Sequence, residues 1–216
     1  MRIKVVVPIT DRSFETETRE EVGRLVSPGT EVDVESIRYG PASIESEYDE
    51  LLAAPGILKI AKEAEAAGFD GIFVSCMGDP AVDAARELVR IPVVGPARAS
   101  MLYAADLAHR FSVVTVLENV LVLLENLALQ YGVKDRLASV RSIDIPVLCL
   151  VDREKLLDAL VRESVRAIEE DGAHAIILGC TGMIGVSEEL AGALAEKGFG
   201  VPVIYPLAVS VKHLEA

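Results

Sequence analysis

Two cysteines, Cys76 and Cys180, occupy matching places in two similar segments of the chain. In each segment a glycine lies eight residues before the cysteine, another lies two residues after it, and an apolar run leads to the thiol. A thiolate can take a proton from a carbon acid, and a thiol can give one back. Two thiols on opposite faces of one carbon would therefore interconvert its two configurations.

Both cysteines are predicted to lie where a strand ends and a helix begins. After the first, Asp79 and Pro80 predict a helix N-cap and a first helical residue. The amide groups at the start of a helix would favour the thiolate and lower a thiol pKa from its ordinary value of about 8.5. Neighbouring hydroxyls and glycine amides would contact a bound oxygen atom: Ser75, Gly78, Thr181 and Gly182.

A single cysteine at the end of an apolar strand is more often a small buried hydrophobic residue than a reactive one. The matched setting of Cys76 and Cys180 favours chemistry for this pair. Cys149 has no matching segment and no neighbouring glycine, so a structural role is expected for it.

Other chemistry is poorly provided for. The three histidines, His109, His174 and His213, have no metal-ligand spacing, so no metal site is expected. The chain also lacks the glycine-rich dinucleotide and phosphate-loop motifs and the Gly-x-Ser-x-Gly motif of serine hydrolases. We therefore expect no cofactor.

The composition excludes several classes of partner. A net charge of −13 and a pI near 4.7 argue against nucleic acid, which requires clustered Lys and Arg. No apolar run approaches the ~18 residues of a membrane span, and no signal-peptide pattern follows Met1. Three cysteines are too few for a disulfide scaffold. These features predict a cytoplasmic protein with a small-molecule substrate and no membrane partner.

Short β-branched runs alternate with longer segments of helical period, which is typical of an α/β protein with mainly parallel strands. Strands are predicted at residues 3–7, 31–37, 71–75, 93–95, 112–116, 138–143, 175–179 and 203–205. Helices are predicted at residues 14–25, 48–67, 80–89, 100–108, 119–131, 153–170, 184–196 and 207–214.

The order of these elements repeats. Similar runs open the two halves, at Arg2 and Arg110, and each half then contains a second strand, a cysteine-bearing strand and a last strand introduced by proline. The repeat predicts two pseudo-symmetric α/β lobes, each with a four-stranded, mainly parallel sheet. Their expected extents are residues 1–108 with 206–216, and residues 109–205.

These segments resemble the hydantoin and allantoin racemases of the aspartate/glutamate racemase superfamily. The resemblance is carried by Gly40–Asp49, Ser75–Pro80, Ile91–Gly95, Arg110–Thr115, Ser142–Val147 and Leu178–Met183. It implies a site in a cleft between two lobes, cofactor-free proton transfer by Cys76 and Cys180, and a homo-oligomer. It also implies a pocket lined by Pro8, Ile44, Ser75, Gly78, Thr115, Thr181 and Gly182, with the Gly40–Ile44 turn closing it.

The segment after the first strand departs from the family. The family commonly has Asn-Pro-Asn-Thr there, whereas this chain reads Val7-Pro8-Ile9-Thr10. The resemblance favours a 5-substituted hydantoin or a ureide such as allantoin as substrate. Three alternatives stay open: a racemase of acidic amino acids, an enzyme like arylmalonate decarboxylase or maleate isomerase, and a non-catalytic binding protein.

Overall fold

The computed structural model describes all 216 residues, which form two compact units. The first comprises Met1–Ala99 and Leu207–Ala216, and the second comprises Ser100–Pro206. The predicted lobes met after residue 108, at the end of a helix, whereas the observed boundary falls inside helix α4, Pro96–Leu107.

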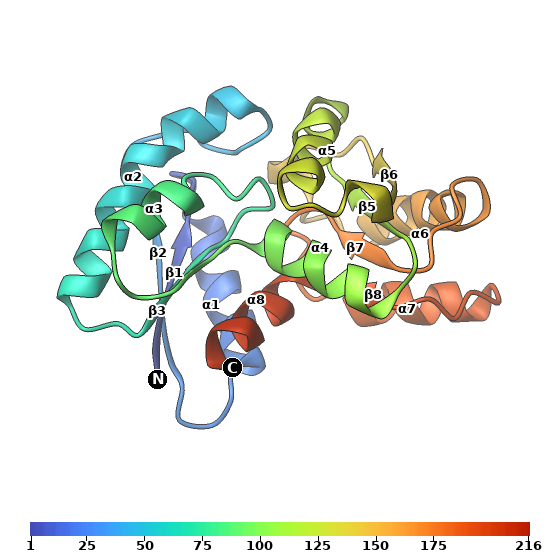
Figure 1. Cartoon of the computed structure of the whole chain (residues 1–216). Coiled ribbons are helices and arrows are strands. Elements are labelled where there is room, and N and C mark those ends of the chain that lie inside the picture. Colours follow the sequence, from blue (N-terminus) through green and yellow to red (C-terminus); the bar gives the residue numbers. More distant parts are fainter. The chain divides into compact units, whose positions relative to one another are not determined.

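The first unit is built on a parallel sheet of four strands (Figure 1). The strands are β1 (Arg2–Val7), β2 (Glu31–Ser36), β3 (Gly71–Val74) and β4 (Val93–Val94), in the order β2-β1-β3-β4. Its helices are α1 (Ser13–Leu25), α2 (Glu47–Ala66), α3 (Val82–Leu88), the start of α4 and α8 (Pro206–Glu215). The C-terminal helix joins this unit, where the Glu215 carboxylate accepts hydrogen bonds from the Ser27 amide (2.7 Å) and hydroxyl (2.8 Å).

The second unit repeats this plan with a sheet in the order β6-β5-β7-β8. Its strands are β5 (Phe111–Thr115), β6 (Leu137–Ser142), β7 (Ile176–Leu178) and β8 (Val203–Ile204), all parallel. Its helices are α5 (Leu121–Gln130), α6 (Arg153–Glu169), α7 (Ser187–Glu196) and the larger part of α4. Three short 3₁₀ turns, η1 (Glu118–Val120), η2 (Lys134–Arg136) and η3 (Val147–Cys149), complete it.

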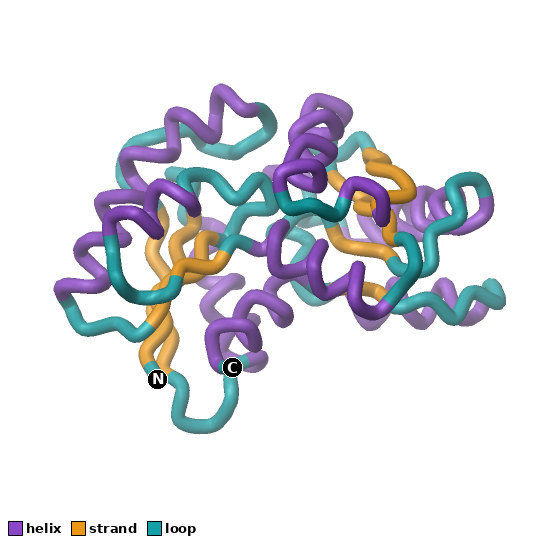
Figure 2. The backbone as a smooth tube through the Cα atoms, in the orientation of Figure 1, coloured by secondary structure: helices purple, strands orange, loops and turns teal.

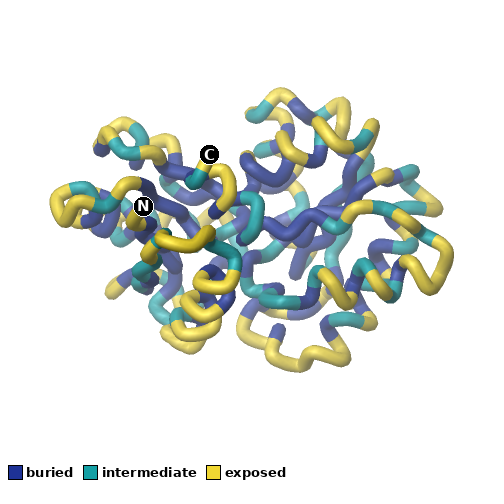
Figure 3. The backbone as a smooth tube through the Cα atoms, turned by 90° about the horizontal axis from the view of Figure 1, so that it is seen from below, coloured by how far each residue is buried: buried dark blue, intermediate teal, exposed yellow.

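The cores explain why the inner strands consist almost entirely of apolar residues. Every residue of β3, β5 and β7 is buried, as are five of the six in β1. A parallel sheet is covered by helices on both faces, so its central strands need apolar side chains on both sides. Helices flank the strands in both units (Figure 2), and buried stretches alternate with exposed ones along the backbone (Figure 3). The predicted α/β class with two four-stranded parallel sheets is confirmed.

All eight predicted strands are present within one residue at either end. Four helix starts differ from the prediction by two residues or more, and one of them is α5, which begins at Leu121 rather than at Asn119, directly after the 3₁₀ turn η1. Helix α3 begins at Val82 rather than at Pro80, α7 begins at Ser187 rather than at Ile184, and α4 begins earlier, at Pro96 rather than at Ser100. Two of these differences change the surroundings of the cysteines.

Candidate active site

Cys76 is half-buried in the loop that leaves β3. The Ser75 amide donates to the Val6 carbonyl (2.8 Å), which ties the start of the loop to β1. The Asp79 amide donates to the Cys76 carbonyl (3.0 Å), which closes a turn over residues 76–79. The cysteine is therefore held in a short, hydrogen-bonded turn at the carboxyl end of an inner strand, where parallel sheets bind their ligands.

The predicted capping role of Asp79 is wrong for the helix that follows it. Its backbone is left-handed (φ +50°), as is that of Ala81 (φ +54°), so no right-handed helix can run through these residues. The Asp79 carboxylate instead accepts the amide hydrogens of Ala97 and Arg98, both at 2.9 Å, in the first turn of α4. A β-carbon on Gly95 would collide with this carboxylate. Asp79 thus ties the Cys76 turn to the start of α4.

Cys180 is also half-buried, in the loop that leaves β7. The Gly182 amide donates to the Cys180 sulfur (3.3 Å). A donor at the sulfur stabilises the thiolate more than the thiol. The Met183 amide donates to the Cys180 carbonyl (3.2 Å), so this cysteine too lies in a hydrogen-bonded turn.

The predicted junction between each cysteine and a helix is not observed. Five residues lie between Cys76 and the start of α3 at Val82, and six lie between Cys180 and the start of α7 at Ser187. The effect of a helix terminus falls off within its first turn, so the predicted activation, which required a helix to begin directly after each thiol, loses its basis. Amide groups within the turns take its place, most directly the Gly182 amide at Cys180.

Both ends of the Cys180 loop are anchored within the second unit. At the start, the Thr115 hydroxyl donates to the Gly179 carbonyl (2.9 Å). At the end, the Gly185 amide donates to the Tyr205 hydroxyl (3.0 Å), and Arg153 donates to the Gly185 carbonyl (2.7 Å). The hydroxyl of Thr115, predicted to line a pocket, therefore holds the residue that precedes Cys180.

Gly179 makes a testable contribution to this loop. A β-carbon there would lie 2.6 Å from Cβ and 2.7 Å from Cα of Thr115, and 2.8 Å from the Val114 carbonyl oxygen. Because two of these three atoms belong to the backbone, Gly179→Ala is expected to lower the free energy of unfolding by about 1–3 kcal/mol in urea denaturation.

Gly192 supplies the matched control, since it lies in α7 and has no atom within 4 Å of an added β-carbon. Gly192→Ala is expected to stabilise the protein by roughly 0.5–1 kcal/mol. Equal effects of the two substitutions would show that Gly179 is not in close contact with β5.

The turn predicted to close the pocket is fastened to the loop after β1. The amide and the hydroxyl of Thr10 both donate to the Pro41 carbonyl, at 2.9 and 3.1 Å. Pro8 and Ile44 are both buried. The structure thus joins the loop that contains Pro8 to the Gly40–Ile44 turn, although the two are far apart in sequence.

Ser75 and Thr181, the hydroxyl residues beside the two thiols, are both buried, with exposed fractions of 7% and 8%. Ser75 directly precedes Cys76, and Thr181 directly follows Cys180. The two hydroxyl groups therefore belong to corresponding loops of the two units. Gly78 and Gly182 lie two residues after the cysteines, and the Gly182 amide contacts the Cys180 sulfur.

One carboxyl group beside the Cys76 turn was missed in the sequence. Glu50, in the first turn of α2, has its carboxyl group directly over Gly78, in the space that a β-carbon there would occupy. Burial, and then the negative charges of Asp79, Glu47 and Asp49, raise the pKa of Glu50 to about 8. Carboxylates on helices were interpreted as solvated charge, and no motif distinguishes this one.

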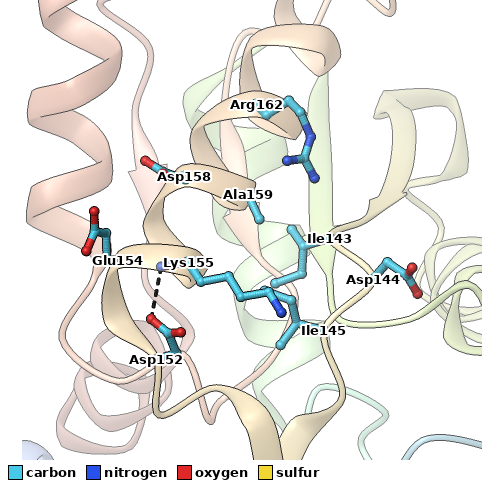
Figure 4. A pocket seen from close by; sticks show the side chains of 9 residues that line it. All are labelled: Ile143, Asp144, Ile145, Asp152, Glu154, Lys155, Asp158, Ala159 and Arg162. Carbon is cyan, nitrogen blue, oxygen red and sulfur yellow. Dashed lines mark hydrogen bonds between the residues drawn. The ribbon is translucent and has the colours of Figure 1, made fainter.

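Two pockets lie away from the cysteines. In the second unit, a pocket of about 560 Å³ lies beside the start of α6 (Figure 4), where the Lys155 amide donates to the Asp152 carboxylate (3.2 Å). Its lining consists of Ile143, Asp144, Ile145, Asp152, Glu154, Lys155, Asp158, Ala159 and Arg162. In the first unit, a pocket of about 500 Å³ lies between α2 and the segment around Tyr39. Neither is lined by Cys76 or Cys180, and the second includes Gly40 of the turn that was predicted to close the substrate pocket.

Two kinds of feature are absent from the structure. No three His, Cys, Asp or Glu side chains are arranged to hold a metal ion. None of the helices combines the length and the apolar character needed to cross a lipid bilayer.

Comparison with known proteins places the chain in a family. Residues 3–214 match the family model described as Asp/Glu/hydantoin racemase. The whole chain is 40% identical to a hydantoin racemase of Pseudomonas sp. (strain NS671) and 36% identical to one of Rhizobium meliloti, covering 85% and 88% of those proteins. The solved structure of an allantoin racemase from Klebsiella pneumoniae aligns over the whole chain and 86% of its own, with a TM-score of 0.92 and 38% identity. The chain therefore belongs to the Asp/Glu/hydantoin racemase family of isomerases.

Proposed function

We propose that this protein is a cofactor-independent racemase of 5-substituted hydantoins or of a related ureide such as allantoin, with Cys76 and Cys180 as its two proton-transfer groups. The observation that carries the proposal is the equivalence of the two cysteines. Cys76 follows β3 and Cys180 follows β7, which hold the same place in the two sheets, and each lies in a hydrogen-bonded turn. Relatives of this chain named hydantoin racemase and allantoin racemase support the substrate class.

In the proposed reaction, one cysteine is a thiolate and the other is a thiol. The thiolate removes the C5 proton of the ring, and the electron pair of the broken C–H bond moves toward the C4 carbonyl to give an enolate. The thiol on the opposite face then protonates C5, which leaves the first sulfur protonated and the second ionised. The enzyme is then poised for the reverse reaction, so no cofactor is consumed or required.

The surroundings of the turns fit this chemistry. The Gly182 amide at the Cys180 sulfur would favour a thiolate there, and backbone amides of the turns would stabilise the developing enolate oxygen. Ser75, Gly78 and Thr181 are proposed to contact the substrate, with Pro8 and Ile44 at the edge of the pocket. Thr115 is proposed to contribute by holding Gly179.

The charge near Cys76 favours a neutral ring over a free acidic amino acid. Asp79 lies in the Cys76 turn, so a substrate carboxylate brought there would be repelled by the charge of the Asp79 carboxylate. Aspartate and glutamate carry two carboxylates, whereas hydantoins and allantoin need carry none. The absence of the family's asparagines around Pro8 leaves the 5-substituent open.

Two further features belong to the proposal, the first through the resemblance and the second through the composition of the chain. We expect a homo-oligomer and a cytoplasmic location. The latter agrees with three cysteines that form no disulfide.

A panel of chiral compounds tests the substrate class. Enantiopure 5-substituted hydantoins, allantoin, aspartate and glutamate are incubated with the protein, and optical rotation is followed. We expect the rotation of a hydantoin or of allantoin to decay to zero, and that of the two amino acids to persist. Racemisation of the amino acids alone would favour the alternative within the superfamily, and binding without turnover would favour a non-catalytic protein.

A further inference from the structure

The carboxyl group of Glu50 occupies a place that glycine alone leaves open. If Gly78 carried a β-carbon, that atom would overlap Oε1 of Glu50. Gly78 is the third residue of the Cys76–Asp79 turn, which is closed by the hydrogen bond from the Asp79 amide to the Cys76 carbonyl (3.0 Å). The Glu50 side chain therefore packs directly on the turn that holds the thiol.

The contact is unusual for a carboxyl group. Oε1 of Glu50 is buried and has no hydrogen-bond partner. A buried, unpaired carboxylate is costly, whereas a neutral carboxylic acid is tolerated much better. Three carboxylates act on it electrostatically: Glu47 and Asp49 on α2, and Asp79 on the turn. Burial and these three charges together explain why the pKa of Glu50 is raised to about 8.

We propose that Glu50 is a positioning residue for Cys76: as a neutral acid packed on Gly78, it holds the 76–79 turn and keeps the surroundings of the thiol free of one further negative charge. The inference rests on the proposed role of Cys76. It explains why an acidic side chain can lie beside a group that must ionise. When Glu50 itself ionises, the new charge opposes the thiolate of Cys76.

The alkylation rate of Cys76 tests the electrostatic part without any substrate. Cys149→Ser and Cys180→Ser leave one thiol, whose reaction with iodoacetamide is measured between pH 6 and 10. Glu50→Gln is expected to move the midpoint of this profile to lower pH and to raise the rate at pH 8.5 about two- to fivefold. Glu63→Gln, which changes an exposed carboxylate of the same helix, is expected to leave the profile unchanged. An unchanged midpoint in the Glu50→Gln variant would overturn the proposal.

Racemisation by the full chain tests the positioning part. Glu50→Ala removes the group that packs on Gly78 and is expected to lower kcat at least tenfold with little change in KM. Glu50→Gln, which keeps the shape of the neutral acid, is expected to retain most of the parent kcat at pH 7. Equal loss in both variants, or no loss in either, would contradict the proposal.

The two experiments separate this inference from the proposed function. If no hydantoin is racemised but the alkylation midpoint still shifts, only the proposed function fails. If racemisation proceeds and the midpoint stays fixed, only the role of Glu50 fails.

Discussion

Replacing Cys76 or Cys180 with serine, one at a time, is expected to lower the racemisation rate of a chiral hydantoin by roughly 10²- to 10⁴-fold in both directions. Serine is close to cysteine in size, but its hydroxyl is far less acidic than a thiol. In the proposed mechanism, each turnover needs a base on one face of C5 and an acid on the other, so the loss of either partner slows both directions. Initial rates from each enantiomer, followed by circular dichroism, measure the effect.

Cys149→Ser is the matched control, because Cys149 is an exposed cysteine at the end of η3 with no matching segment in the first unit. We expect this variant to racemise the substrate at the parent rate. Retention of a rate within tenfold of the parent in either the Cys76→Ser or the Cys180→Ser variant would show that the remaining thiol is enough, and the two-thiol mechanism would be abandoned.

Glu50→Gln is expected to stabilise the folded protein at alkaline pH. The pKa of Glu50 is about 8 in the folded chain and takes the ordinary value of 4.5 when the chain unfolds. Between these values the folded state binds a proton that the unfolded state lacks, so the stability of the parent falls as pH rises. The loss amounts to at most about 1.4 kcal/mol for each pH unit, and it is complete above pH 8. Glutamine cannot ionise, so the Glu50→Gln variant does not lose stability in this way.

The comparison requires urea denaturation of both proteins at pH 4 and at pH 8.5. The two free energies of unfolding are expected to agree closely at pH 4, where Glu50 is neutral in both states, and to differ by a few kcal/mol at pH 8.5. Glu63→Gln, at an exposed position of the same helix, is expected to show no such pH dependence. A stability difference of the same size at both pH values would mean that packing, rather than ionisation, distinguishes the two side chains.

Much of the fold could be predicted because the relevant signals are local. Apolar runs such as Gly71–Val74 and Ile176–Leu178 are the length of a buried strand, and helical periods separate them. Repetition of the same order around Cys76 and Cys180 then indicated two similar units.

The errors around the cysteines have a different origin, because they depend on contacts between distant residues. Asp79 followed by Pro80 is a good local signal for a helix start, yet the Asp79 carboxylate binds amides of Ala97 and Arg98 in another helix. With that long-range contact in place, Asp79 has a left-handed backbone conformation, and α3 begins only at Val82. A residue pattern cannot reveal which of two helix starts a carboxylate will cap.

Glu50 was missed for a similar reason. In the sequence it is one of several acidic residues at the start of a helix. Such residues interact favourably with the helix dipole and are normally solvated. Only the folded chain brings its carboxyl group onto Gly78, which lies far along the sequence. The contact of the Thr115 hydroxyl with Gly179, across neighbouring strands, likewise depends on the fold, although Thr115 itself was predicted as a site residue.

Deuterium incorporation by the unaltered protein in D₂O tests the central claim most directly. A thiol holds a single proton, so the sulfur that removes the C5 proton keeps it, while the product receives its hydrogen from the other sulfur, which has exchanged with solvent. Early in the reaction of one enantiomer of a 5-substituted hydantoin, we predict deuterium at C5 of nearly all the product and almost none in the recovered substrate. Deuterium appearing equally fast in substrate and product would indicate one base serving both faces and would contradict proton transfer by the Cys76–Cys180 pair.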